Sequence, residues 1–158
     1  MTASSFHHES SSRYGVVLSI LLVMFCGRVM AQLIQAIYPL SFLPSFDSWH
    51  SGALPYGVLV LAQFIIIGIC VHVIRGLFNL TIVPSLRRGN MLLGLGGVYL
   101  GGMMLRLILG LTIARNHFWF GAVLPTIFHV VLATFLLVYG HFHYRYGHSS
   151  NASSVVAS

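Results

Sequence analysis

Three polar side chains share one face of the first long apolar stretch of the chain. Arg28, Gln32 and Gln35 follow one another at intervals of four and three residues, and residues so spaced lie on the same side of an α-helix. A guanidinium group donates hydrogen bonds and keeps its charge, whereas a glutamine amide both donates and accepts. This spacing predicts a polar stripe that can bind an anion or a polar small molecule.

Other polar residues are expected at the same depth of a helical bundle. Depth counted along the apolar stretches brings Gln63 and Arg106 close to Arg28, with the connection that carries Asp47 directly above them. Asp47 is the one acid of this zone and neutralises a single arginine, so an anionic ligand suits the other. The candidate ligand-binding residues are Arg28, Gln32, Asp47, Trp49, His50, Gln63, Arg106 and His129.

The arginines can also serve the bundle without any ligand, in either of two ways. A charged side chain at membrane depth costs about 2.5–3.5 kcal/mol on insertion scales, so it normally faces the bundle interior and has a partner. In the first way, the arginines join neighbouring helices or extend their charged ends to the interface. In the second, a partner subunit supplies the missing acid. Both alternatives stay open at the level of the sequence.

The nine histidines raise the question of haem or a metal. His72 and His129 lie in apolar stretches, but their heights differ by about eight residues, or ~12 Å, which is too far for two axial ligands of one haem. His141 and His143 match His72 better in depth, but they belong to an aromatic stretch at the interface. No HExxH or CxxC spacing is present. We therefore predict no haem b and no metal; His129 either serves a quinone or bonds a neighbouring helix.

No catalytic residue is predicted. Glu9 and Asp47 are the only acids of the chain, so no carboxylate pair exists, and no nucleophile lies beside a base. Non-enzymatic ligand binding is therefore the first hypothesis. A membrane subunit of an electron-transfer complex and a structural or assembly subunit are the alternatives.

The elements that must position these residues follow from composition. The chain has 158 residues, of which 57% are hydrophobic and 6% charged, whereas about a quarter of a soluble domain is charged. A bilayer core of ~30 Å is crossed by ~20 apolar residues of helix, and four such windows are present. The prediction is an all-α membrane protein, an antiparallel bundle of four transmembrane helices, with spans at about 14–37, 56–74, 91–113 and 118–139.

The distribution of arginines predicts the orientation. Five lie in the two tails and the second loop, against Arg115 alone in the first and third loops, and basic residues are retained on the cytoplasmic side. Both termini are therefore predicted in the cytoplasm and the protein in the inner (plasma) membrane. The expected partners are the lipid bilayer and a membrane protein or a second copy. Nucleic acid is not expected, because the arginines are dispersed. The polar tails, 1–13 and 144–158, are predicted to be disordered.

The first and third spans, and the first loop, carry further predictions. Val29-Met30-Ala31 resembles a signal-peptide cleavage site, although the apolar run continues past it. The loop over residues 38–56 is rich in proline and aromatic residues. It either folds over the polar zone as a lid or lies in the interface as a hairpin. Gly97 and Gly101 form a GxxxG spacing, which predicts close packing on a neighbouring helix.

The order of several motifs resembles that of a group of small bacterial inner-membrane proteins with four predicted helices. The motifs are WHSGALPY in the first loop, the arginine pair before the third span, GGVYLGGMMLR within it and FWFGAVLPTIFH in the fourth. The resemblance covers the chain from Arg28 to His129 and implies the architecture and no activity. The residues that form the pattern are Arg28, Trp49, His50, Pro55, Arg106, Pro125 and His129.

Overall fold

The computed structural model describes the backbone of residues 3–49, 55–113 and 123–156, and the side chains of 11–46, 49, 55–113 and 123–147. All regular secondary structure in this part of the chain is helical. The helices are α1 (Ala3–Ile37), α2 (Tyr56–Phe78), α3 (Leu86–Thr112) and α4 (Val123–Val156), with a short 3-10 helix, η1 (Phe46–Trp49). All four α-helices contain a stretch long and apolar enough to cross a membrane. The all-α prediction with four such helices is confirmed.

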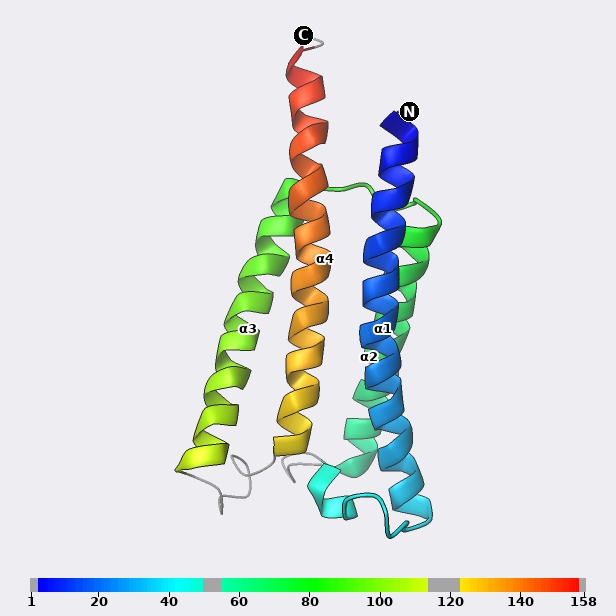
Figure 1. Ribbon diagram of the computed structural model, residues 1–158, viewed down its shortest axis with the longest axis vertical. Helices are drawn as coiled ribbons and strands as arrows, with labels where there is room; N and C mark the ends of the chain where they lie inside the picture. The colour runs from blue at the N-terminus through cyan, green and yellow to red at the C-terminus, as the bar shows by residue number, and fades with distance from the viewer. Residues whose placement is uncertain (1–2, 50–54, 114–122, 157–158) are drawn as a thin grey trace.

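The four helices form two pairs (Figure 1). Helix α3 packs along α4, α2 packs along α1, and α1 joins the pairs because it also contacts α4. The beginning of α1 and the end of α4 lie at one end of the molecule, which we call the termini end. At the opposite end, η1 contacts both α1 and α4. This opposite end, which we call the loop end, holds the polar stripe.

The helices are longer than the predicted spans. Helix α2 continues to Phe78, α3 begins at Leu86, and the apolar part of α4 runs over Val123–Gly147. The apolar windows end at the arginines and histidines near the helix ends, because hydropathy falls there. The helical backbone hydrogen bonds continue through these residues. Their long cationic side chains can reach the membrane interface. Helical backbone also covers residues 3–13 and 144–156; the disorder of these tails in solution stays a prediction.

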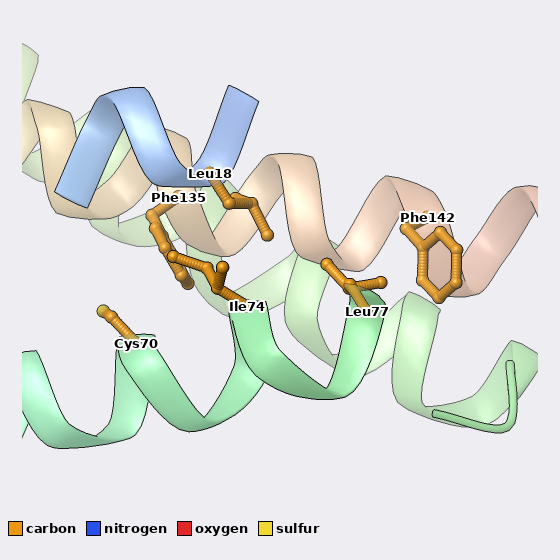
Figure 2. Packing of buried hydrophobic residues seen from close by; sticks show 6 residues of the cluster. All are labelled: Leu18, Cys70, Ile74, Leu77, Phe135 and Phe142. Atoms are coloured by element: carbon orange, nitrogen blue, oxygen red, sulfur yellow. The ribbon is translucent and has the colours of Figure 1, made fainter. Parts of the chain in front are cut away.

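The apolar core runs from the middle of the bundle toward the termini end, and Figure 2 shows six of its side chains. Its buried side chains come from α1, α2 and α4 and point toward one another. Leu18 and Leu77 are almost completely buried within it. Because lipid tails are as apolar as these side chains, dense van der Waals packing is what holds such helices together in a bilayer. The cluster consists of Leu18, Cys70, Ile74, Leu77, Phe135 and Phe142.

Hydrogen bonds close the same end of the bundle. The hydroxyl of Ser11 in α1 donates to the carbonyl of Leu77 in α2 over 2.8 Å. The hydroxyl of Tyr14 lies 2.9 Å from Nδ1 of His141 in α4, and its ring meets that of Phe142 edge to face. These polar contacts fix α1 against both of its neighbours.

Glycines let α3 and α4 approach closely. A Cβ atom added to Gly89 would lie 2.5 Å from the backbone nitrogen of Tyr144. One added to Gly147 would lie 2.5 Å from the backbone nitrogen of Leu86. Both positions are closed to any larger residue, because backbone atoms cannot move aside as a side-chain tip can.

The predicted GxxxG contact is not made. A Cβ atom added to Gly97 or Gly101 would meet nothing within 4 Å. The close approach instead uses the face of α3 with Gly89 and Gly96. The spacing rule correctly indicates that glycine permits contact, but it does not say which glycine face of a helix turns inward.

We expect Gly89→Ala to destabilise the bundle and Gly97→Ala to leave it as stable or more so. Overpacking of this kind costs about 1–3 kcal/mol, whereas alanine in an open helical position gains up to about 1 kcal/mol over glycine. Thermal unfolding in detergent, followed by circular dichroism, measures both. A melting temperature for Gly89→Ala equal to that of Gly97→Ala would contradict the described α3–α4 packing.

Candidate functional site

The polar stripe of α1 faces the inside of the bundle, as its spacing predicts. The side chains of Arg28, Gln32 and Gln35 are 7%, 0% and 7% exposed. Gln63 of α2, which is 4% exposed, donates from Nε2 to Oε1 of Gln32 over 3.2 Å. The structure thus brings together polar residues from two helices, in a part of the bundle that is otherwise apolar.

Arg28 joins the stripe to the first loop. Its Nη2 donates to the backbone carbonyl of Trp49 over 2.6 Å, and its guanidinium carbon lies 5.7 Å from the ring centre of Phe128. The indole of Trp49 is 5% exposed and donates to the carbonyl of Pro44 over 3.0 Å. The described part of the first loop therefore packs against α1 and α4 at η1. Residues 50–54 lie outside the described residues, so the lid and the interfacial hairpin both stay predictions.

A cavity of about 180 Å³ opens beside Arg28, between α1, α2 and α4. Its polar lining consists of Arg28, Gln63 and His129. The remaining walls are apolar side chains, among them Phe25, Pro125 and Phe128 of α1 and α4. We call this hollow the loop-end cavity.

Several buried polar atoms of the loop end have no protein partner within the described part of the chain. Nε of Arg28 and Oε1 of Gln63 belong to residues that line the loop-end cavity, whereas Nε2 of Gln32 and the hydroxyl of Tyr56 belong to residues that do not. Leaving a buried donor or acceptor unpaired costs about 1–3 kcal/mol, and more for a charged group. The cavity is thus lined by one residue with an unpaired donor and one with an unpaired acceptor, which a ligand can satisfy.

His129 lies at the depth of Arg28. The described part of α4 begins at Val123, which places Pro125 in its first turn and His129 in its second. His129 lines the loop-end cavity together with Arg28 and Gln63. The part of the predicted fourth span that precedes Val123 lies outside the described residues.

Tyr99 is a member of the site that the sequence did not single out. Its hydroxyl lies 2.6 Å from Nδ1 of His129, and the two rings meet edge to face. Arg106, which is 5% exposed, follows Tyr99 by seven residues and shares its face of α3. The seven-residue interval between Tyr99 and Arg106, which is two helical turns, is the sequence feature that could have indicated Tyr99. Arg106 does not line the loop-end cavity.

Two predicted site residues cannot be placed. His50 and the side chain of Asp47 lie outside the described residues. The same holds for the side chain of Glu9, the second acid of the chain. No carboxylate is therefore among the side chains that the structure describes, and the site as described carries positive charge.

The histidines of the described chain do not gather. Within residues 11–46, 55–113 and 123–147 no group of three or more histidine, cysteine or acidic side chains is placed to hold a metal ion. His72 lines a different hollow, near the termini end, and His143 accepts a hydrogen bond from the backbone nitrogen of Ser85 over 3.1 Å. The candidate ligand-binding groups of the loop end thus come from arginine, glutamine, tyrosine and a single histidine.

Comparison with known proteins gives no relative from which a function can be carried over. No family model, no curated protein and no solved structure matches the chain. The resemblance in motif order stays a prediction about architecture. The site is interpreted from its own chemistry.

We expect Arg28→Leu to release η1 from the bundle. The substitution removes a charge-assisted hydrogen bond of about 1.5–3 kcal/mol, so the indole of Trp49 should meet water. In a Trp119→Phe background, fluorescence then reports Trp49 alone, and its emission should move to longer wavelength with stronger quenching by acrylamide. The control is Arg87→Leu at the termini end. Unchanged emission in Arg28→Leu would show that the hydrogen bond does not hold the loop.

Proposed function

We propose that the chain is a multi-pass protein of the inner membrane, an antiparallel bundle of four spans with both termini in the cytoplasm. Large apolar side chains on its outer faces support membrane insertion: Ile37, Val98 and Ile113 are 84%, 80% and 85% exposed. Such faces suit lipid and not water. The arginine distribution supports the orientation, which turns the loop end and its cavity outward.

We infer that the function is to bind a small ligand with a polar or anionic head in the loop-end cavity. The observation that carries this proposal is a hollow of about 180 Å³ lined by Arg28 and Gln63, each of which has a buried polar atom with no partner in the described part of the chain. A single water occupies about 30 Å³ in the liquid, so the hollow takes a larger group. A phosphate or carboxylate accepts several hydrogen bonds from one guanidinium.

Binding is favoured over catalysis by the residue types present. The described part of the site offers donors, one amide acceptor and a histidine that is already bonded to Tyr99. It supplies neither a carboxylate nor a nucleophile beside a base, which acid–base and covalent catalysis need. The apolar walls exclude water and strengthen each polar contact to a bound head.

We expect Arg28→Leu to lose binding of dodecyl phosphate, an amphipathic anion. Each hydrogen bond to a charged group contributes about 1.5–3 kcal/mol, which corresponds to a loss of affinity of at least about tenfold. The parent protein for this comparison carries Arg75→Gln and Arg88→Gln, which remove the two arginines of the hollow at the termini end. Native mass spectrometry of the detergent-purified protein, titrated with the alkyl phosphate, measures the bound fraction. Equal binding by the variant and its parent would remove the proposal.

A matched pair of glutamine variants separates binding from folding. Gln63 and Gln35 are both buried in the polar zone, but only Gln63 lines the loop-end cavity. Gln63→Leu should weaken binding of dodecyl phosphate about fivefold to tenfold, since one hydrogen bond contributes about 1 kcal/mol or somewhat more. Gln35→Leu removes only the contact with the backbone nitrogen of Leu40 and should leave binding unchanged. Equal losses in the two variants would point to a general effect on the bundle.

A second candidate function is a quinone site, favoured by the Tyr99–His129 pair. Since Nδ1 of His129 is hydrogen-bonded to Tyr99, a Tyr99 hydroxyl that donates leaves Nε2 of the ring as a donor. A quinone carbonyl accepts such a bond, and its apolar tail fits apolar walls. Ultraviolet spectra of organic extracts, recorded before and after borohydride reduction, test this candidate. A wild-type preparation with no quinone difference spectrum would eliminate it.

A further inference from the structure

A second hollow, of about 520 Å³, lies at the termini end, where α2 passes into α3. Two arginines line it: Arg75 from the last turn of α2 and Arg88 from the first turn of α3. His72, Asn79 and Thr81 add further hydrogen-bonding groups. We call this hollow the basic hollow.

The start of α3 makes the basic hollow more positive than its side chains alone do. The first N–H groups of a helix lack intrahelical partners, and the helix dipole places positive charge there. This first turn contains no acidic residue and instead carries Arg87 and Arg88. Arginines at a helix N-terminus are unfavourable unless an anion lies beside them. The charge pattern therefore fits an anion held between the two helices.

An apolar cavity of about 340 Å³ adjoins the basic hollow. The two share Val73 and Tyr139 in their walls. The cavity lies between α2, α3 and α4, and all of its lining is apolar except for the tyrosines. No Cα atom of α2 comes within 8 Å of one in α3. These two helices are therefore separated by side chains and by this cavity.

The dimensions of the apolar cavity suit a hydrocarbon chain. Its wall on α2 runs from Ile66 to Val73, which is about 10 Å of helix at 1.5 Å per residue. One leaflet of the hydrocarbon core is about 15 Å deep. A chain that enters beside Arg75 and Arg88 thus extends through most of the leaflet before it reaches the end of the cavity.

We propose that the basic hollow and the apolar cavity together bind one anionic phospholipid. The phosphate of the headgroup lies between Arg75 and Arg88, and an acyl chain lies between α2 and α3. Basic pockets between transmembrane helices bind anionic headgroups in this way. This proposal rests on membrane insertion. Its headgroup site uses Arg75 and Arg88 rather than Arg28, although the apolar cavity also shares Ile66 and Leu132 with the loop-end cavity.

The first test compares neighbouring arginines. Arg87 and Arg88 are both exposed, but only Arg88 lines the basic hollow. In native mass spectrometry of protein released from nanodiscs of equal phosphatidylglycerol and phosphatidylcholine, wild type should retain phosphatidylglycerol selectively. Arg88→Gln should lower that preference about fivefold, and Arg75→Gln with Arg88→Gln further. Arg87→Gln should preserve the preference for phosphatidylglycerol. If Arg87→Gln and Arg88→Gln lower this preference equally, the lipid is held by the general positive charge of the surface and the proposed site is wrong.

The second test addresses the acyl chain. Ile69 lines the apolar cavity and is 59% exposed, so Ile69→Trp adds bulk there without disturbing the core cluster. It should lower retention of phosphatidylglycerol, and Arg28→Leu should not. Glycerol 3-phosphate, which has the headgroup phosphate and no chain, should fail to displace the lipid. Displacement by glycerol 3-phosphate, or full retention in Ile69→Trp, would overturn the lipid assignment and leave a site for a simple anion.

Discussion

The loop end depends on one hydrogen bond, from the guanidinium of Arg28 to the carbonyl of Trp49. In an apolar medium a charged group and a non-helical backbone carbonyl are each costly to bury, because lipid supplies no partner for either. Together they satisfy one another. The bond joins η1 to α1, and η1 also contacts α4. The indole of Trp49 is thereby buried, and Arg28, which makes the bond, also lines the loop-end cavity. The surrounding polar groups are arranged about this contact.

The two ends of the bundle achieve burial differently. At the termini end the core cluster packs α1, α2 and α4 together, and Gly89 and Gly147 bring α3 and α4 so close that only glycine fits. The loop end has no such cluster among its described residues; there, buried polar groups of α1 and α2 bond one another and the first loop. Dense packing stabilises a single arrangement, whereas unsatisfied polar atoms store free energy that a ligand can recover. The core cluster therefore contributes mainly stability, and the polar groups of the loop end are free to contribute recognition.

Much of this arrangement could be predicted from sequence, because it depends on local periodicity. The four helices follow from apolar windows, and the inward stripe of α1 follows from the spacing of Arg28 to Gln35. What depended on the mutual rotation of helices could not be predicted. The contact face of α3 uses Gly89 rather than Gly97, and Tyr99 meets His129 because the faces of α3 and α4 that carry them turn toward each other. Sequence spacing gives the face of a helix, and only packing decides which face turns inward.

The nitrogen-15 spectrum of the arginine side chains tests most directly whether Arg28 binds the anionic head of a ligand. The chain has eight arginines and no lysine, so arginine-selective labelling gives few Nε signals, and Arg28→Leu identifies the one from Arg28. On addition of dodecyl phosphate to the wild type in detergent, the Arg28 Nε–H signal should shift strongly, because this buried group gains a partner. The signal of exposed Arg87 should move little. A bound alkyl phosphate that leaves the Arg28 signal in place would contradict this role of Arg28.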